Sequence, residues 1–321
     1  MSVQDDVLTL LLERQGEPVS GADIADRLGV TRSAVWKAVE KLRTDGYPID
    51  AVTNRGYTLT SDCGLLSAAQ IGSHLHTKVL GRELTVHRVL ESTNKTAKEL
   101  AAAGAPDGTV VIAEQQTGGR GRLGRSFYSP PGSGIYMSVI LRPKLATEYT
   151  LLLTSAAAVA VARAVDGMFG TFAQIKWVND IYLNDKKVCG ILTEGGLNFE
   201  SGGFDYVVIG IGINVTTAYF PEELRTIASA VTSDKADRAK LTAAVLDELE
   251  KIYLSLPETD FMLDYRVRSL VIGHDVWVIR GEEKYKAHVL DVNSFGNLIV
   301  SDESGAIKEI STGEVSIRKA D

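Results

Sequence analysis

The stretch Gly118-Gly119-Arg120-Gly121-Arg122-Leu123-Gly124-Arg125 places three arginines and four glycines within eight residues, and four residues separate it from the apolar run Val110–Ala113. Glycine lets the backbone come close to a ligand, and guanidinium groups bind carboxylate or phosphate oxygens through paired hydrogen bonds. The whole chain carries a net charge of −7. This local concentration of positive charge therefore predicts a site for an anionic substrate.

Two other glycine-rich motifs must be weighed against this interpretation. Gly119, Gly121 and Gly124 match the G-x-G-x-x-G spacing of dinucleotide-binding folds, which requires a strand directly before the glycines and a helix directly after them. Here Glu114–Thr117 separates the expected strand from the glycines, and Pro130-Pro131 follows too soon for a helix. No Gly-Lys-Ser or Gly-Lys-Thr follows, which argues against a Walker loop. A solvated, flexible basic loop remains the alternative to a substrate site.

Length and composition describe an ordinary globular protein. Of the 321 residues, 45% are hydrophobic and 23% are charged. A chain of this length is long enough for two or three domains. Cys63 and Cys189 are isolated, so we expect a reducing compartment, no disulfide framework and a buried Cys189. The N-terminus lacks the features of a signal peptide, and the run Leu151–Val165 is too short and too polar to span a bilayer. These features predict a cytoplasmic protein with no membrane partner.

Residues 1–63 predict a winged helix-turn-helix domain. Ser20 is suited to cap a helix over Gly21–Leu28 that Gly29 ends, and Thr31 to cap a further helix over Arg32–Thr44. Two helices joined by a glycine turn have the geometry that places the second helix in a DNA major groove. Two short β-rich runs follow, and their expected turn at residues 54–56 would form the wing.

We expect this domain to contact DNA through polar, aromatic and basic side chains of the second helix and the wing tip. They are Thr31, Arg32, Ser33, Trp36, Lys37, Lys41 and Arg55. Acidic residues outnumber basic ones in the segment, so the alternative is a small helical docking module. Binding would depend on these local cations and on dimerisation, which doubles the contacts.

The remaining chain predicts two further domains, which makes the fold class α+β. Residues 64–270 alternate strands and helices, as expected of a central α/β domain with a mixed sheet. Residues 271–321 contain short strands broken by glycines, which predict a small SH3-like β-barrel. The strands expected in the central domain are Leu84–Val89, Val110–Ala113, Gly134–Leu141 and Val207–Val215, and its long helices are Thr150–Met168 and Arg238–Leu254.

Four other clusters of the central segment have unusual composition. Ser92-Thr93-Asn94 precedes a helix, where its side chains can cap the helix or hold a small polar ring. Lys176–Asp180 combines a cation, an aromatic ring, an amide and a carboxylate, which could equally be a surface ion pair beside a core tryptophan. Lys187–Leu192 puts a lysine before an apolar strand, and Gly210–Asn214 ends a buried strand with glycines and an amide. The histidines show no catalytic or zinc-binding spacing.

These motifs together resemble those of the biotin protein ligases. The match comprises STN, QQTGGRGRLGR, KWVNDI, KVCGIL and GIGINV, at residues 92–94, 115–125, 176–181, 187–192 and 210–215, and it extends in order over the whole chain. With the winged-helix segment and the C-terminal barrel, the chain is similar to the bifunctional bacterial form, which is also the repressor of the biotin operon. Val178 stands where many relatives have proline, a difference we expect to be harmless.

The resemblance implies an enzyme with two substrates, biotin and ATP, that requires Mg²⁺. It would form biotinyl-5′-AMP and transfer the biotinyl group to a lysine of a biotin carboxyl carrier domain, such as that of acetyl-CoA carboxylase. It also implies a homodimer when the protein is loaded with biotinyl-AMP, and operator DNA as a partner.

The resemblance further implies a role for each matching residue. Catalysis would use Arg120, Arg122 and Lys187, with Asp180 orienting a lysine or the metal. Biotin would contact Ser92, Thr93, Asn94, Gln116, Gly119, Arg120, Gly121, Arg122, Lys187 and Gly190. The nucleotide would contact Arg125, Phe127, Lys176, Asn179 and Asn214, with the Phe127 ring covering adenine once the loop closes. No protein metal ligands are assigned.

Two alternatives remain open at this point. One is a ligase for lipoate or another acid on the same architecture, against which the polar Ser92-Thr93-Asn94 cluster argues. The other is a ligand-sensing transcription factor whose central domain has no catalytic activity.

Overall fold

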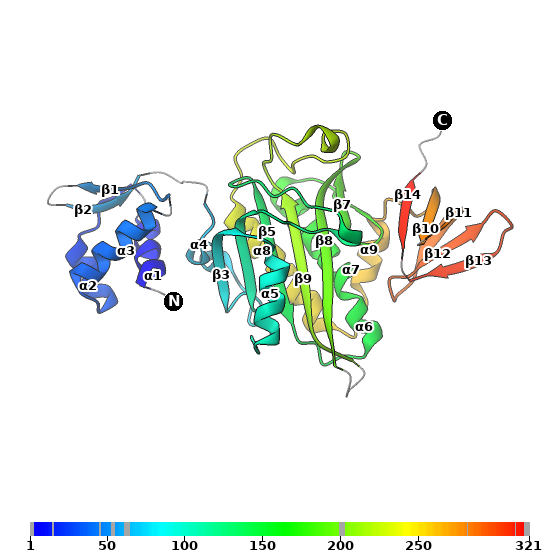
Figure 1. Ribbon diagram of the computed structural model, residues 1–321, viewed down its shortest axis with the longest axis horizontal. Coiled ribbons are helices and arrows are strands. Elements are labelled where there is room, and N and C mark those ends of the chain that lie inside the picture. The colour runs from blue at the N-terminus through cyan, green and yellow to red at the C-terminus, as the bar shows by residue number, and fades with distance from the viewer. Residues whose placement is uncertain are drawn as a thin grey trace.

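The computed structural model describes residues 3–14, 16–44, 46–52, 55–60, 65–198, 203–280, 282–311 and 313–317. Three bodies follow one another along the long axis of the molecule (Figure 1). A small helical body contains the N-terminus, a large body built on a sheet lies in the middle, and a small body of strands lies near the C-terminus.

The N-terminal body has the helices and strands expected of a winged helix-turn-helix. They are α1 (Val3–Glu13), α2 (Gly21–Leu28), α3 (Arg32–Thr44), β1 (Ile49–Val52) and β2 (Gly56–Leu59). β1 and β2 pair antiparallel, and α1 packs against α2 and α3. The expected turn residue Asn54 lies outside the described residues, whereas Arg55 is described and exposed.

The predicted cap residues hold the ends of the two helices. Ser20 Oγ accepts a hydrogen bond from the backbone N–H of Ala22, and Thr31 Oγ1 accepts one from Ala34 at 3.2 Å. Gly29 has φ 64°, the left-handed conformation that ends α2. α3 buries its apolar face, so its polar face is left exposed.

The central body is built on one seven-stranded sheet in the order β3-β4-β5-β9-β8-β7-β6, in which only the β3–β4 pair is parallel among the described strands. The strands are β3 (Leu84–Leu90), β4 (Val110–Gln116), β5 (Gly134–Leu141), β6 (Gln174–Lys176), β7 (Asp180–Leu183), β8 (Lys186–Asn198) and β9 (Gly203–Asn214). The helices are α4 (Ala68–His74), α5 (Thr93–Ala102), α6 (Thr147–Leu151), α7 (Leu153–Phe169), α8 (Arg238–Ser255) and α9 (Phe261–Val267). β4 continues through Gln116, three residues beyond the predicted end of this strand.

Helices cover the two faces of this sheet unequally. α7 packs on α8 and on β6 to β9, and this face contains the main hydrophobic core. α5 contacts β4, β5 and β9 from the opposite side over a small apolar cluster. In β9, Ile209, Ile211 and Ile213 belong to the main core, so the residues between them, including Gly210 and Gly212, face the α5 side.

The apolar run of the sequence belongs to the core of the central body. α6 and α7 follow one another, so the helical stretch Thr147–Phe169 is longer than the sequence analysis allowed and, among the described helices, is the one long and apolar enough to cross a membrane. However, 67% of its most apolar window is buried inside the protein. Contacts with α8 and the sheet therefore account for its hydrophobicity.

The C-terminal body is a five-stranded antiparallel sheet in the order β13-β12-β11-β10-β14. β13 and β14 form the two edges of this order, so closure into an SH3-like barrel stays a prediction. The strands are β10 (Asp275–Arg280), β11 (Glu283–Val292), β12 (Leu298–Asp302), β13 (Ile307–Ile310) and β14 (Glu314–Ile317).

A buried ion pair joins four segments of the central body. Glu114 of β4 lies 3.0 Å from Arg238 of α8, and their side chains are only 3% and 4% exposed. Glu114 also accepts the backbone N–H of Leu66, where the chain enters the central body, and Arg238 donates to the carbonyl of Gly134 at 2.7 Å. The pair thus fixes the start of this body, β4, β5 and α8 to one another.

We expect Glu114→Ala to destabilise the central body by about 3–5 kcal/mol, because it leaves the Arg238 guanidinium buried without its carboxylate. Urea unfolding followed by circular dichroism measures this change. Lys95→Ala is the matched control, since it removes an exposed ion pair with Glu91 and should not shift the transition. Equal midpoints for the wild type and Glu114→Ala would contradict the role given to the buried pair.

Candidate functional site

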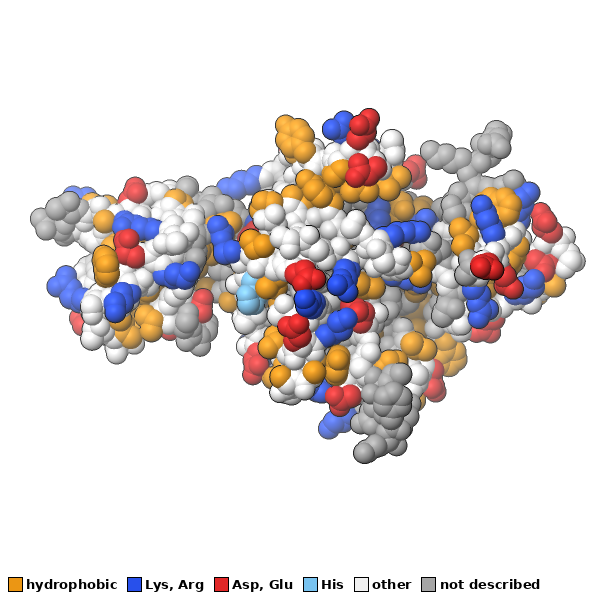
Figure 2. All heavy atoms as spheres, in the orientation of Figure 1, with side chains coloured by type: hydrophobic (Ala, Val, Ile, Leu, Met, Phe, Trp, Pro, Cys, Tyr) orange, Lys and Arg blue, Asp and Glu red, His pale blue; other side chains and the backbone are white. Residues whose placement is uncertain are grey.

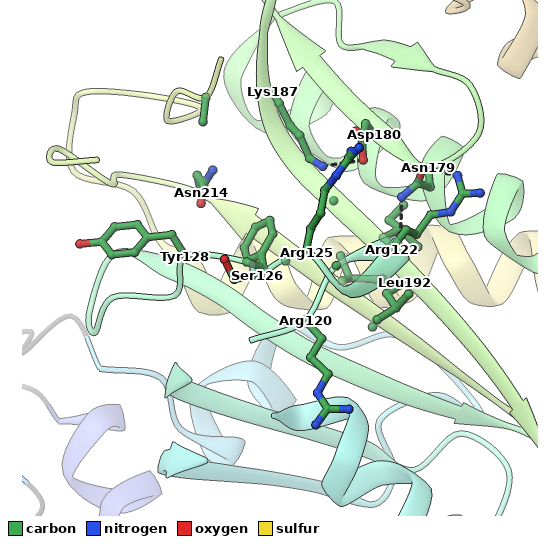
Figure 3. Close-up of a pocket in the computed structure, with 18 of the residues that line it drawn as sticks. Arg120, Arg122, Arg125, Ser126, Tyr128, Asn179, Asp180, Lys187, Leu192 and Asn214 are labelled. Atoms are coloured by element: carbon green, nitrogen blue, oxygen red, sulfur yellow. Dashed lines mark hydrogen bonds and ion pairs between the residues drawn. The ribbon is translucent and has the colours of Figure 1, made fainter. Parts of the chain in front are cut away.

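The main cavity lies on the α5 side of the sheet and has a volume of about 370 Å³. Its walls come from the start of α5, the arginine-rich loop after β4, and strands β7, β8 and β9, with residues 220–228 at the rim (Figure 3). Arg120 and Lys187, which lie 67 positions apart in the chain, both line this single cavity.

Glycines on two neighbouring strands form the floor of the cavity. Gly190 of β8 pairs with Gly212 of β9, and Gly210 lies between Leu192 and Ser138 on the adjoining strands. A Cβ atom on Gly212 would lie 2.6 Å from the Phe127 ring. The Phe127 ring therefore lies against the glycine backbone in this structure.

One end of the cavity is lined by polar groups from α5 and β4. Thr93 donates its backbone N–H to Gln116 Oε1 at 2.8 Å, and Gln116 Nε2 donates to Ser129 Oγ at 3.0 Å. Ser92 occupies the N-cap position of α5 but makes no side-chain cap bond. Its hydroxyl therefore does not serve the capping role that the sequence left open.

Asn94 belongs to the same polar end and is held on three sides. Its Nδ2 donates to Glu194 Oε2 at 2.8 Å and to the Leu192 carbonyl at 3.2 Å. Its Oδ1 accepts a hydrogen bond from Ser138 Oγ at 2.6 Å. The amide is thus fixed between α5 and the sheet.

The cations of the site each have a partner in the ligand-free protein. Lys187 Nζ lies 2.7 Å from Asp180 Oδ1 (Figure 3). The Arg120 side chain is 59% exposed and points away from the cavity, with its guanidinium 3.6 Å from Glu91 Oε1 (Figure 3). Arg120 must therefore turn before it can reach a ligand in the cavity.

Arg122 connects the loop to the rest of the protein. Its Nη1 donates to Asn179 Oδ1 and its Nη2 to the backbone carbonyl of Gly313, both at 3.1 Å. Gly313 immediately precedes β14, so this side chain bridges the central and C-terminal bodies. A second cavity of about 230 Å³ adjoins it, lined by residues of both bodies.

The arginine-rich loop contains one strained residue. Leu123 has φ 54°, a left-handed conformation that is unusual for a side chain of its size, and it is 75% exposed. Gly121 donates its N–H to the Arg125 carbonyl at 2.7 Å, which folds the tip of the loop back on itself. Strain in an exposed tip is expected where a loop must change its conformation.

Another part of the cavity lining contains a buried amide and a lysine, Asn214 and Lys176. Asn214 is buried, and its Oδ1 has no hydrogen-bond partner among the described residues. Lys176 Nζ lies 5.8 Å from the centre of the Tyr182 ring. An unpaired buried amide oxygen is costly unless a ligand supplies a donor.

The structure brings together almost all of the ligand-binding residues expected from the sequence. Gly119 alone among them does not line the cavity, and a Cβ atom on it would lie 2.5 Å from the Phe127 carbonyl. Cys189 is buried, as expected, and burial raises its pKa well above the usual range. The lining residues that the sequence analysis did not assign are Ser126, Tyr128, Met137, Tyr182, Ile191, Leu192, Gly210, Ile211, Gly212, Phe220, Leu224, Ile227 and Ala228.

Most of the residues expected to contact DNA are exposed residues of α3, while Thr31 precedes this helix and Arg55 precedes β2. Trp36 is 54% exposed, although tryptophan is usually buried at least in part. Figure 2 shows Lys and Arg side chains spread over the visible face of this body, with few Asp and Glu between them. Arg43 instead donates to Glu40 and to the Ile49 carbonyl, so it stabilises the domain itself. The expected contact residues Thr31, Arg32, Ser33, Trp36, Lys37, Lys41 and Arg55 are all exposed.

Comparison with known proteins agrees with both the site and the N-terminal body. Residues 86–214 match the Biotin/lipoate A/B protein ligase family, and residues 3–58 match a family described as HTH domain. The chain is 38% identical to the bifunctional ligase/repressor BirA of Bacillus subtilis over 98% of this chain and 99% of that protein. It is 30% identical to the bifunctional ligase/repressor BirA of Escherichia coli over 97% of each chain.

A solved structure is similar to a large part of the chain. The biotin protein ligase from Aquifex aeolicus in complex with biotin and ATP superposes with a TM-score of 0.64 at 30% identity, covering 74% of this chain and 100% of that one. The chain thus belongs to the biotin/lipoate A/B protein ligase family and, within it, to the bifunctional ligase/repressors of the BirA type.

Proposed function

We propose that this protein activates biotin with ATP and transfers the biotinyl group to a lysine of a biotin carboxyl carrier domain, such as that of acetyl-CoA carboxylase. The observation that carries this proposal is that amide and hydroxyl groups and a set of arginines and lysines line the same cavity. The Aquifex structure that the chain resembles contains biotin and ATP. A ligase with these substrates needs both kinds of group in one cavity.

In the first step, a carboxylate oxygen of biotin attacks the α-phosphorus of ATP. The new C–O–P linkage forms as the bond to pyrophosphate breaks, which gives biotinyl-5′-AMP. Two anions must approach one another, so Lys187, Arg122 and a reoriented Arg120 would offset their repulsion. Asn214 and Lys176 would hold the nucleotide at the other end of the cavity.

In the second step, the amine of the carrier lysine attacks the acyl carbon. The amide bond forms, AMP leaves with the electron pair of the C–O bond, and the amine loses a proton to solvent. The mixed anhydride must be kept from water between the two steps. The exposed glycine-rich loop is suited to this task, because ordering it over the cavity would exclude solvent.

Mg²⁺ would enter with the nucleotide and neutralise part of the phosphate charge. Asp180 is the one carboxylate among the described residues that line the cavity. Mg²⁺ bound to substrate phosphates commonly uses only one or two protein carboxylates. The donor set therefore fits a metal that the substrate carries.

Biotin fits the polar end better than lipoate does. Gln116, Thr93 and Asn94 present amide and hydroxyl groups there, whereas the dithiolane ring of lipoate has no N–H group and accepts hydrogen bonds only weakly. Thermal-shift measurements with biotin and with lipoate distinguish the two acids. A larger stabilisation by lipoate would reject biotin as the substrate.

We further propose that the chain represses biotin genes when it is loaded with biotinyl-AMP. The DNA-binding domain would comprise residues 1–63, the ligase domain residues 64–270, and an SH3-like barrel residues 271–321. The protein would act in the cytoplasm. The exposed polar face of α3 supports this proposal, and a loaded homodimer would present two such faces to an operator.

Lys187→Ala should slow adenylate formation about 10- to 100-fold, because one charge-assisted hydrogen bond to the reacting anions is lost. Pyrophosphate release in the presence of biotin and ATP measures the rate. Lys251→Ala, which removes an exposed lysine of α8, serves as the control and should react like the wild type. A wild-type rate for Lys187→Ala would overturn its assignment.

Arg120→Ala should affect the adenylate more than its formation, because the guanidinium is turned toward Glu91 before ligands bind. We expect biotinyl-AMP to dissociate about tenfold faster from this variant. Release of labelled adenylate after rapid dilution measures the rate. Unchanged retention would show that the Arg120 guanidinium does not contact the adenylate.

Operator binding should weaken steeply as salt increases, because lysines and arginines of α3 and the wing displace counterions from DNA. Lys37→Ala should lower the affinity and reduce the slope of log K against log salt by about 1. Fluorescence anisotropy at several salt concentrations gives both values, with Lys251→Ala as the control. An unchanged slope would remove Lys37 from the interface.

A further inference from the structure

Asn94 can hold its side-chain amide in only one orientation. Its Nδ2 contacts a carboxylate, Glu194, and a backbone carbonyl, Leu192, and both groups can only accept hydrogen bonds. The opposite atom must therefore be the oxygen, and Ser138 can donate to it. The acceptors Leu192 and Glu194 of β8 thus fix the nitrogen of Asn94 on their side and its oxygen on the side of Ser138.

The Asn94 oxygen lies directly against the glycine floor of the cavity. A Cβ atom on Gly210 would lie 2.1 Å from Oδ1, so no other residue at that position leaves the amide in place. Asn94 and Gly210 both line the cavity. The oxygen is therefore held in a fixed position against the glycines that line the polar end of the cavity.

Glu194 stays ionised in this position. Partial burial opposes ionisation, yet hydrogen bonds from Lys98 and Asn94 hold the pKa of Glu194 below its usual value. Lys98 Nζ contacts Glu194 Oε1, and Asn94 contacts the other oxygen. An ionised carboxylate has no proton to donate, so it excludes the reverse orientation of the amide.

We propose that Glu194 is a positioning residue that orients Asn94 and thereby makes the polar end selective for ligands that carry an N–H donor. Under the proposed function, a ureido N–H of biotin would donate to Asn94 Oδ1. This inference rests on that function but concerns a residue that does not touch the ligand. Glu194 acts through Asn94, and Lys98 keeps it charged.

Glu194→Gln tests the proposal with almost no change of shape. A glutamine amide can present its NH₂ group to Asn94, so the side chain at position 194 no longer enforces the orientation of Asn94. Only the Leu192 carbonyl, at 3.2 Å, then opposes a reversed amide. We expect the affinity for biotin to fall about tenfold, as for the loss of one hydrogen bond, while the KM for ATP and the kcat stay within about twofold of the wild type. Isothermal titration and steady-state pyrophosphate release give these values.

Glu99→Gln is the matched control, because it makes the same chemical change on the exposed surface of α5. Its biotin affinity should equal that of the wild type. Gly210→Ala reaches Asn94 from the opposite side without changing Glu194 or Lys98. It should displace the amide and produce the same selective loss of biotin affinity, and circular dichroism establishes that each variant is folded.

The possible results separate the inference from the proposed function. Selective loss of biotin affinity in Glu194→Gln and Gly210→Ala supports the positioning role. Wild-type biotin affinity in Glu194→Gln, or an equal loss for biotin and ATP, overturns it even if the wild type biotinylates a carrier. A wild-type protein that neither binds biotin nor releases pyrophosphate refutes the proposed function itself.

Discussion

The site depends on the absence of side chains from one face of two adjacent strands. Isoleucines of β9 fill the core beneath the sheet, whereas Gly190, Gly210 and Gly212 leave its other face open. Elsewhere on that face, apolar side chains pack against α5. A larger residue at any of these three positions would place its side chain in the space above the sheet, because protein interiors are closely packed. The missing Cβ atoms make room for Asn94 and Phe127, which lie against the glycines and line the cavity themselves.

The positively charged side chains of the site are already paired with other groups of the protein before a ligand binds. Lys187 lies beside Asp180, Arg120 beside Glu91 and Arg122 beside Asn179, so no charge has to be desolvated alone. An incoming anion exchanges one partner for another, and the net gain is smaller than the gross strength of the new bonds. The binding energy therefore depends on how much better a phosphate or carboxylate fits each cation than its resting partner does.

Local patterns in the sequence were sufficient for most of the fold. Caps at Ser20 and Thr31 and the apolar run Gly134–Leu141 define their elements within a few residues, and the structure has them where they were predicted. The motifs also identified the walls of the cavity. Long-range partners could not be predicted, because Glu114 and Arg238 are separated by 124 positions and no local pattern links them. The direction of the Arg120 side chain and the rim at residues 220–228 depend on tertiary contacts in the same way.

The C-terminal body contributes none of the residues expected to bind a ligand. However, its Gly313 carbonyl accepts a hydrogen bond from Arg122 in the arginine-rich loop. Arg122 holds Gly313 with one nitrogen and Asn179 with another. If the C-terminal body moved away from the central body, Arg122 would lose its hydrogen bond to Gly313 and keep the one to Asn179. The C-terminal body therefore contacts the arginine-rich loop through a main-chain oxygen, and its removal would take away one anchor of the loop without deleting any residue of the loop itself.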